Sequence, residues 1–273
     1  MRGGVYGRRS RAAGRGGPGV VRRTLPAALV FALALTALVL LRDDLRGLIG
    51  TVPGSPRSVS ATHPLYRETG PVDARCDTLP ENRDADVVGT LKTLSRCLDR
   101  MWATTLGEAG VGYERPGEVR LVSTPEEAAC GTGDGDWAGI YCPDRRVVNV
   151  LVEGGQALPA MFTLAHEYAH HVQEVGGMAD LLGPGGFDEA WSRRLELQAD
   201  CLAAVTLRTV EPRVLETQRL LAVSDDAADD ETAEGYRRSH GSGVSSAAWI
   251  TRGQRDGTLA ACDTWGVPAA EVS

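Results

Sequence analysis

The stretch LAHEYAHHVQE, residues 164–174, holds three of the five histidines of the chain, with a glutamate directly after the first of them. If the stretch is helical, His166 and His170 are four residues apart and lie on one face. Two imidazoles at that spacing can hold one zinc ion. Glu167, one residue round the helix from His166, cannot take the same coordination position on the zinc ion. Its carboxylate can instead take the proton of a zinc-bound water as that water attacks a carbonyl. The spacing therefore predicts the active site of a zinc hydrolase.

A His-Glu-x-x-His match is not specific by itself, and a third ligand is needed. The stretch RRLELQADCLAAV places Glu196 and Asp200 four residues apart on a second predicted helix, from about Asp188 to Thr209. Glu196 can complete the zinc coordination, and Asp200 can hydrogen-bond the outer nitrogen of a ligand histidine. Two carboxylates on an otherwise apolar helix are costly to bury without a cation. The alternative, a solvated acidic stripe, stays open.

The residues that flank the histidines predict the helix that they require. Pro159 suits a first helical turn and Gly176–Gly177 suits an end, so a helix is expected over residues 159–175. His171 points away from the metal-facing side of this helix. We assign it to the helix surface or to the surroundings of the ligands, and not to the metal.

Three further segments complete the expected fold. A helix begins near Asp84, because apolar residues then recur at three- and four-residue steps: Val88, Leu91, Leu94, Leu98, Met101 and Trp102. The stretches EVRLV and RVVNVLV predict short strands, separated by the loop CGTGDGDWAG. RVVNVLV is either a sheet edge that binds an extended peptide or a plain core strand. The pattern predicts an α+β domain, mainly helical with a small sheet.

The N-terminal region predicts a membrane anchor. Arginine-rich residues 1–24 precede LPAALVFALALTALVLL, residues 25–41, which carry no charge and are just long enough to span a bilayer. The arginines place residues 1–24 in the cytoplasm and the rest outside the cell membrane. Residues 42–70, rich in Pro, Ser and Gly, are the expected linker. A single catalytic domain is expected over residues 71–273.

Cysteine usage agrees with an extracytoplasmic domain. Six cysteines follow the apolar segment, and their spacing does not resemble a zinc ribbon, so disulfides are expected. Six cysteines allow 15 pairings. We expect neighbours along the chain to pair: Cys76 with Cys97, Cys130 with Cys142, and Cys201 with Cys262.

The charge distribution argues against nucleic acid as a partner. The net charge is −7, but residues 1–46 hold nine arginines and two aspartates, which leaves 20 basic and 34 acidic residues in the remainder. A body with a net charge of −14 repels phosphates.

Taken together, the motifs HEYAHHVQ and LELQADCLA, a later HGS and the stretch RGQRDGTLAACDTW resemble the neutral zinc metallopeptidases of bacteria, a membrane-anchored family. The resemblance covers most of residues 76–265 and implies a zincin-like metalloprotease domain. It implies His166, His170 and Glu196 as zinc ligands, Glu167 as catalytic base, and peptides or proteins as substrates. One departure is SSAAW, which stands where the family usually carries a Gln-Arg pair before the tryptophan.

His240, in RRSHGSG, is a candidate for a donor that stabilises the oxyanion, with Tyr168 and Tyr236 as lesser candidates. Two alternatives to a zinc endopeptidase remain: a catalytically silent zinc-binding scaffold or interaction domain on the cell surface, and a disulfide-held surface protein without metal. Glu167 favours the enzyme over the scaffold, because a scaffold needs ligands but has no use for a base.

Overall fold

The computed structural model describes six ranges of the chain, all within one compact unit, Thr51–Ser273: residues 62–67, 69–131, 137–152, 154–179, 188–225 and 231–273. The predicted basic tail, the predicted anchor over residues 25–41 and most of the predicted linker lie outside these ranges. Within them, each helix is too short or too polar to cross a bilayer.

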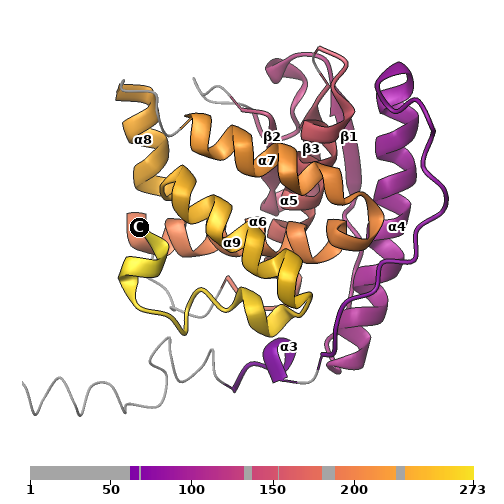
Figure 1. Ribbon diagram of the computed structural model, residues 1–273. Helices are drawn as coiled ribbons and strands as arrows, with labels where there is room; N and C mark the ends of the chain where they lie inside the picture. Colours follow the sequence, from indigo (N-terminus) through magenta and orange to yellow (C-terminus); the bar gives the residue numbers. More distant parts are fainter. Residues whose placement is uncertain (1–61, 68, 132–136, 153, 180–187, 226–230) are drawn as a thin grey trace, which may run out of the picture. The chain divides into compact units, whose positions relative to one another are not determined.

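Helices dominate the described residues, as predicted, and a small sheet lies beside helix α5, Ala157–Val175 (Figure 1). Their bounds are α3 Pro64–Arg67, α4 Val87–Glu108, α5 Ala157–Val175, α6 Glu189–Val210, α7 Pro212–Asp225, α8 Glu231–His240 and α9 Gly243–Asp256.

The sheet has three strands: β1 (Glu118–Val122), β2 (Gly139–Cys142) and β3 (Val147–Leu151). Their order is β1-β3-β2, with β1 parallel and β2 antiparallel to β3. The predicted strands correspond to β1 and β3. Because β3 lies in the middle of the sheet, the core-strand alternative is confirmed for RVVNVLV and the peptide-binding edge is wrong. The four residues of β2 were not predicted as a strand.

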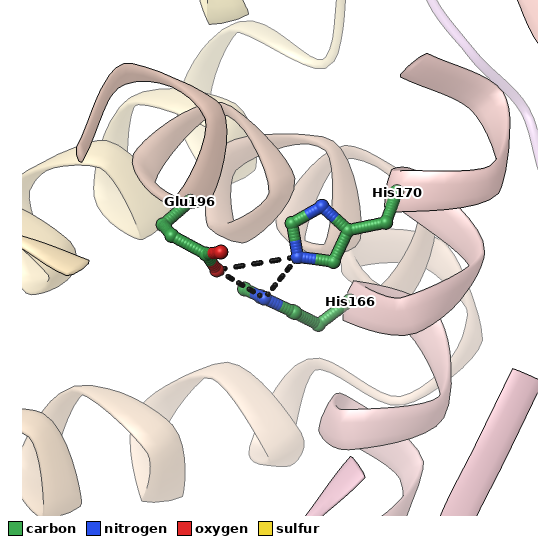
Figure 2. A group of neighbouring side chains, drawn as sticks. All are labelled: His166, His170 and Glu196. Atoms are coloured by element: carbon green, nitrogen blue, oxygen red, sulfur yellow. Dashed lines mark hydrogen bonds and ion pairs between the residues drawn. The ribbon is translucent and has the colours of Figure 1, made fainter. Parts of the chain in front are cut away.

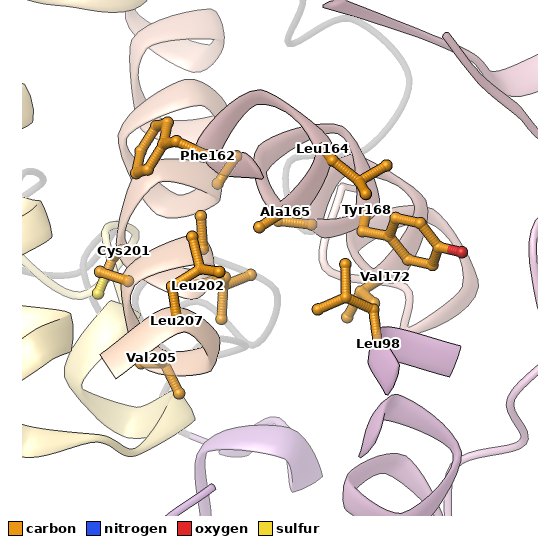
Figure 3. Packing of buried hydrophobic residues seen from close by; sticks show 14 of the residues in the cluster. Leu98, Phe162, Leu164, Ala165, Tyr168, Val172, Cys201, Leu202, Val205 and Leu207 are labelled. Atoms are coloured by element: carbon orange, nitrogen blue, oxygen red, sulfur yellow. The ribbon is translucent and has the colours of Figure 1, made fainter. Parts of the chain in front are cut away.

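Helix α5 carries the histidines and forms the centre of the fold. It begins two residues before the predicted start, at Ala157, and ends as predicted at Gly176 and Gly177, where Gly177 adopts a φ of 69°. Its apolar side chains are buried against both neighbouring helices. Figure 3 shows Tyr168 and Val172 beside Leu98 of α4, and α6 side chains such as Leu202 on the other side. The helix is thereby fixed on two sides.

Helix α6 lies against α5 and carries the predicted carboxylates. Asp188 caps its first turn, because the side chain accepts a hydrogen bond of 2.7 Å from the backbone N–H of Trp191. Two of its three arginines bind the C-terminal segment: Arg193 donates to the carbonyl of Val272, and Arg194 donates to the carbonyls of Thr264 and Val267. Helix α6 is therefore held at its start and along one side.

The three predicted disulfides are confirmed. The Cα atoms of Cys76 and Cys97 are 5.1 Å apart, those of Cys130 and Cys142 5.7 Å, and those of Cys201 and Cys262 5.5 Å. The first ties the segment before α4 to that helix, and the second joins Cys130 to the last residue of β2. The third joins α6 to the segment that follows α9.

Two details differ from the sequence-based expectation. Val88, placed on the apolar face of the first helix, is 43% exposed, and its neighbour Val87 is buried on that face instead, with Leu91 and Leu94. Residues 64–67, assigned to the linker, form α3, and its Leu65 and Tyr66 are buried. The packed part of the chain therefore reaches back into the predicted linker.

Candidate metal centre

Three predicted ligand residues meet between α5 and α6 (Figure 2). The Nε2 atoms of His166 and His170 are 3.1 Å apart, and Oε2 of Glu196 lies 3.1 Å from the first and 3.2 Å from the second. Within the described ranges, this is the group of His, Cys, Asp or Glu side chains with the geometry to hold a metal ion. The spacing of His166 and His170 on one helical turn, and the position of Glu196 on the facing helix, bring the atoms together.

The outer nitrogen of each histidine faces a fixed oxygen. Nδ1 of His166 lies 2.9 Å from Oδ1 of Asp200, and Nδ1 of His170 lies 2.8 Å from Oε1 of Gln173. The second carboxylate oxygen of Asp200 accepts a 2.6 Å hydrogen bond from Ser246 of α9. Because these oxygens accept hydrogen bonds, each neutral histidine carries its proton on Nδ1 and turns a lone pair of Nε2 toward the cluster.

This arrangement fits a zinc ion. Three atoms that each bring a lone pair lie within 3.2 Å of one another, and such atoms repel unless a cation stands between them. Ligands at about 2.0–2.1 Å from a tetrahedral zinc ion are roughly 3.3 Å apart, close to the observed separations. Two nitrogens and one carboxylate oxygen are also a donor set that zinc accepts in catalytic sites.

The pKa shifts of the three side chains also show that the cluster favours a bound positive charge. Burial lowers the pKa of His166, but hydrogen bonds to Asp200 and Glu196 outweigh burial and raise it well above its ordinary value. For His170, burial likewise lowers the pKa, and the charge of Glu196 raises it overall. Burial raises the pKa of Glu196, but the charge of His170 leads the effects that lower it well below the ordinary value. The site therefore stabilises a cation, either a proton or a metal.

Glu167 is buried beside strand β2. A Cβ atom added to Gly139 would lie 2.8 Å from its Cγ and 2.9 Å from its Oε1, so only a glycine lets the strand approach this closely. Burial raises the pKa of Glu167, and the charges of His170 and His166 oppose this effect. Glu167, the predicted base, is thus close enough to the candidate ligands for their charges to act on it, and it lies against the edge of the sheet.

His240 stands beside the cluster, at the end of α8. Its Nε2 is 3.7 Å from Oε2 of Glu196, its Nδ1 is 2.8 Å from the hydroxyl of Ser239, and its ring stacks on Tyr236 at 4.0 Å between centroids. The other lesser candidate, Tyr168, faces away from the cluster, where its hydroxyl bonds the backbone carbonyl of Ser95 on α4. The structure thus brings His240 to the site and does not bring Tyr168.

One of the two expectations for His171, a place on the helix surface, is wrong. It is fully buried, with Nδ1 2.9 Å from the hydroxyl of Tyr141 and Nε2 2.6 Å from the carbonyl oxygen of Glu114. The Tyr141 hydroxyl also bonds Glu174 at 2.7 Å. His171 therefore helps to hold β2 against α5. The side of α5 that faces away from the candidate ligands is covered by the sheet and not by solvent.

Three residues at the site were not found by sequence reasoning. Gln173 contacts Nδ1 of His170 directly, Ser246 bonds Asp200, and Gly139 makes room for Glu167. Gln173 follows His170 at i+3, a spacing that places both on one face, and this signal could have found it. Ser246 and Gly139 come from distant parts of the chain, and no local spacing relates them to the histidines.

Comparison with known proteins agrees with zinc as the cofactor. A family model described as "Putative neutral zinc metallopeptidase" matches residues 3–265. The "Uncharacterized protein Rv2575" of Mycobacterium tuberculosis is 29% identical over 201 residues, which cover 62% of this chain and 67% of that protein. The "Uncharacterized protein YpfJ" of Escherichia coli is 25% identical over 193 residues, which cover 60% of this chain and 67% of that protein. No solved structure gives a significant match.

Proposed function

Because the chain belongs to the putative neutral zinc metallopeptidase family, whose cofactor is zinc, we propose that it is a zinc-dependent endopeptidase with His166, His170 and Glu196 as metal ligands. The observation that carries this proposal is the convergence of three lone-pair atoms within 3.2 Å, each of the two imidazoles being oriented from behind by an oxygen. A cluster of this kind is stable only around a cation.

Glu167 is the proposed general base. A zinc ion held by the three proposed ligands would act as a Lewis acid toward a peptide carbonyl and would lower the pKa of a bound water to roughly 7. Glu167 takes the proton from the attacking water and passes it to the nitrogen of the leaving amine. Its carboxylate is suited to this role because it is buried beside the ligands without being one of them.

His240 is the proposed donor to the oxyanion. Its Nε2 lies 3.7 Å from a ligand oxygen, at the margin of the cluster, and the stacked ring of Tyr236 holds the imidazole in place. A preorganised donor at such a position stabilises the charge that develops on the carbonyl oxygen.

The substrate backbone is proposed to lie along β2. Within the described sheet this strand pairs only with β3, so its other edge can accept an added strand. Gly139, on that strand, lies so close to Glu167 that an added Cβ atom would collide with its carboxylate. A peptide laid along this edge would pass beside the base.

The anchored location remains part of the proposal. The arginine-rich residues 1–24 and the uncharged residues 25–41 support a single membrane span with the enzyme outside, and the three disulfides support an oxidising compartment. The competing function is a zinc-binding scaffold without turnover. Glu167 favours the enzyme, because it is a buried carboxylate that is not one of the proposed ligands and a scaffold has no use for a base.

Zinc content and turnover together test the proposal. Purified protein should contain one zinc per chain, and His170→Ala or Glu196→Ala should lose it. His63→Ala is a matched control, because His63 bonds the carbonyl of Gly176 away from the cluster, and it should keep the metal. The wild type should also cleave members of a diverse peptide library. Full zinc content without any cleavage would favour the scaffold, and unchanged zinc in the ligand variants would refute the ligand set.

A further inference from the structure

We propose that Gln173 is a positioning residue that fixes the tautomer of His170 and ties it to the helix that carries Glu196. This inference rests on the proposed metal site. Gln173 is 1% exposed and Gln198, its neighbour on α6, is fully buried, so both amides must satisfy their polar atoms within the protein.

The orientation of the Gln173 amide follows from its partners. Its Nε2 lies 2.8 Å from the carbonyl oxygen of Leu195, which can only accept a hydrogen bond. The nitrogen of the amide must therefore be on that side, and the oxygen must face Nδ1 of His170 at 2.8 Å. Oε1 can only accept, so Nδ1 carries the proton. The lone pair of Nε2 is thereby reserved for the metal.

The orientation of a second amide, that of Gln198, follows from its partners in the same way. Oε1 of Gln198 accepts the other N–H of Gln173 at 3.0 Å. Nε2 of Gln198 donates to the carbonyl of Cys262 at 3.0 Å and to the hydroxyl of Tyr66 at 2.5 Å. Because the Cys262 carbonyl only accepts, the orientation of Gln198 is also fixed. Each of the two buried amides is thus oriented by its own backbone carbonyl, and of the two only Gln173 contacts the imidazole.

The same contacts couple two ligands of the site. Gln173 belongs to α5, and its acceptor Leu195 directly precedes Glu196 on α6. One side chain therefore bridges the helix of His170 and the helix of Glu196 at the level of the metal. His166 is held differently, by the carboxylate of Asp200. The uncharged amide of Gln173 orients His170 without adding a further negative charge to the site. The site already holds three carboxylates, those of Glu167, Glu196 and Asp200.

The test separates positioning from general support of the fold. Gln173→Met keeps the length of the side chain but removes the acceptor, and zinc affinity should fall about 10–100-fold. Gln173→Glu keeps an oxygen toward His170 and should retain affinity within about 10-fold of the wild type. Both changes remove the amide N–H donor, so both should lower the melting temperature of metal-stripped protein. Zinc affinity is measured by competition with a chelator, and stability by thermal unfolding.

Gln198→Met is the matched control, because it removes a buried amide that does not touch His170. It should lower thermal stability and leave zinc affinity within about 10-fold of the wild type. If Gln173→Met is insoluble, Gln173→Asn, one methylene shorter, should show the same loss of affinity.

Each outcome decides the inference. Loss of affinity in Gln173→Met with rescue in Gln173→Glu supports it. Wild-type affinity in Gln173→Met overturns it, as does an equal loss in Gln173→Glu and Gln173→Met, because a merely structural residue would give that pattern. A wild-type protein that binds no zinc would refute the proposed function itself, and this inference with it.

Discussion

The three acidic side chains around the candidate site have different surroundings. Glu196 and Asp200 contact imidazole nitrogens, whereas Glu167 lies against Gly139 of β2. A carboxylate placed between the ligands and a strand edge can exchange a proton with what is bound there. The difference in surroundings predicts a difference in function that substitution can reveal.

We expect Glu167→Gln to separate metal binding from turnover. The amide has nearly the same shape and does not remove a ligand, so zinc content should stay at that of the wild type. It cannot accept a proton at neutral pH, so peptide hydrolysis should fall about 10²–10⁴-fold. Zinc analysis and kcat/KM on a cleaved peptide measure the two effects.

Glu174→Gln serves as the control for this substitution. It lies two turns further along α5 and pairs with Arg146 instead of the metal ligands. It should keep zinc and most of the activity. Wild-type turnover in Glu167→Gln would refute the proposed mechanism.

The sequence was sufficient to predict which three candidate ligands come together and insufficient to predict what supports them. His166, His170 and Glu196 follow from helical spacing, since a 3.6-residue period sets which side chains share a face. The contact of Ser246 with Asp200 joins α9 to α6, and that of Gly139 with Glu167 joins β2 to α5. Such contacts depend on tertiary packing, which a local pattern does not encode.

At the scale of elements, the long helices were predictable because their periodicity and their terminal residues agree. Helix α6 has Asp188 at its cap and apolar residues along its buried face, and both signals are local. Strand β2 has only four residues and follows a Gly-rich loop, so it is too short to show a periodic pattern, although its Ile140 and Tyr141 favour a strand. Its pairing with β3 and its contacts with α5 define it instead.

An ion pair at the start of α7 gives a prediction on pH and stability. Glu211 is 5% exposed, and its carboxylate bonds Arg213 and Arg83, each at 2.8 Å. Hydrogen bonds from Arg213 lower its pKa, and the charge of Arg83 adds to this effect. A lowered pKa stabilises the fold above the ordinary glutamate value of about 4.3, and the contribution is lost as pH falls through the lower pKa of the folded state.

Glu211→Gln should therefore lower the free energy of unfolding at pH 7 by roughly 1.5–3 kcal/mol, and by much less at pH 3. Urea denaturation at the two pH values measures this difference. Asp73→Asn is the control, because its pair with Arg75 is exposed on both sides, and it should change little at either pH. An equal loss for Glu211→Gln at both pH values would show that its charge is not responsible.

At the scale of the whole molecule, the main prediction concerns topology. Residues 1–24 are rich in arginine and residues 25–41 carry no charge, and the six paired cysteines all come later in the chain. Protease added outside intact cells should degrade the disulfide-bonded domain and leave the N-terminal tail protected. Immunoblots against a tag at each end would follow both parts.

A cytoplasmic marker protein should survive the same treatment, which confirms that the cells stay closed. Protection of both tags would place the domain inside the cell. Recovery of a mature chain that begins between residues 42 and 70 would show a cleaved signal segment in place of an anchor.

Helix α6 depends on residues that are synthesised much later than itself. Cys201 pairs with a cysteine 61 residues further on, the carbonyl of that cysteine receives Gln198, and Arg193 and Arg194 bind carbonyls between Thr264 and Val272. A growing chain therefore exposes all three ligand residues before the segment that fixes their helix has left the ribosome. The order of synthesis therefore requires that the candidate site stay incomplete until the C-terminal segment has packed against α6.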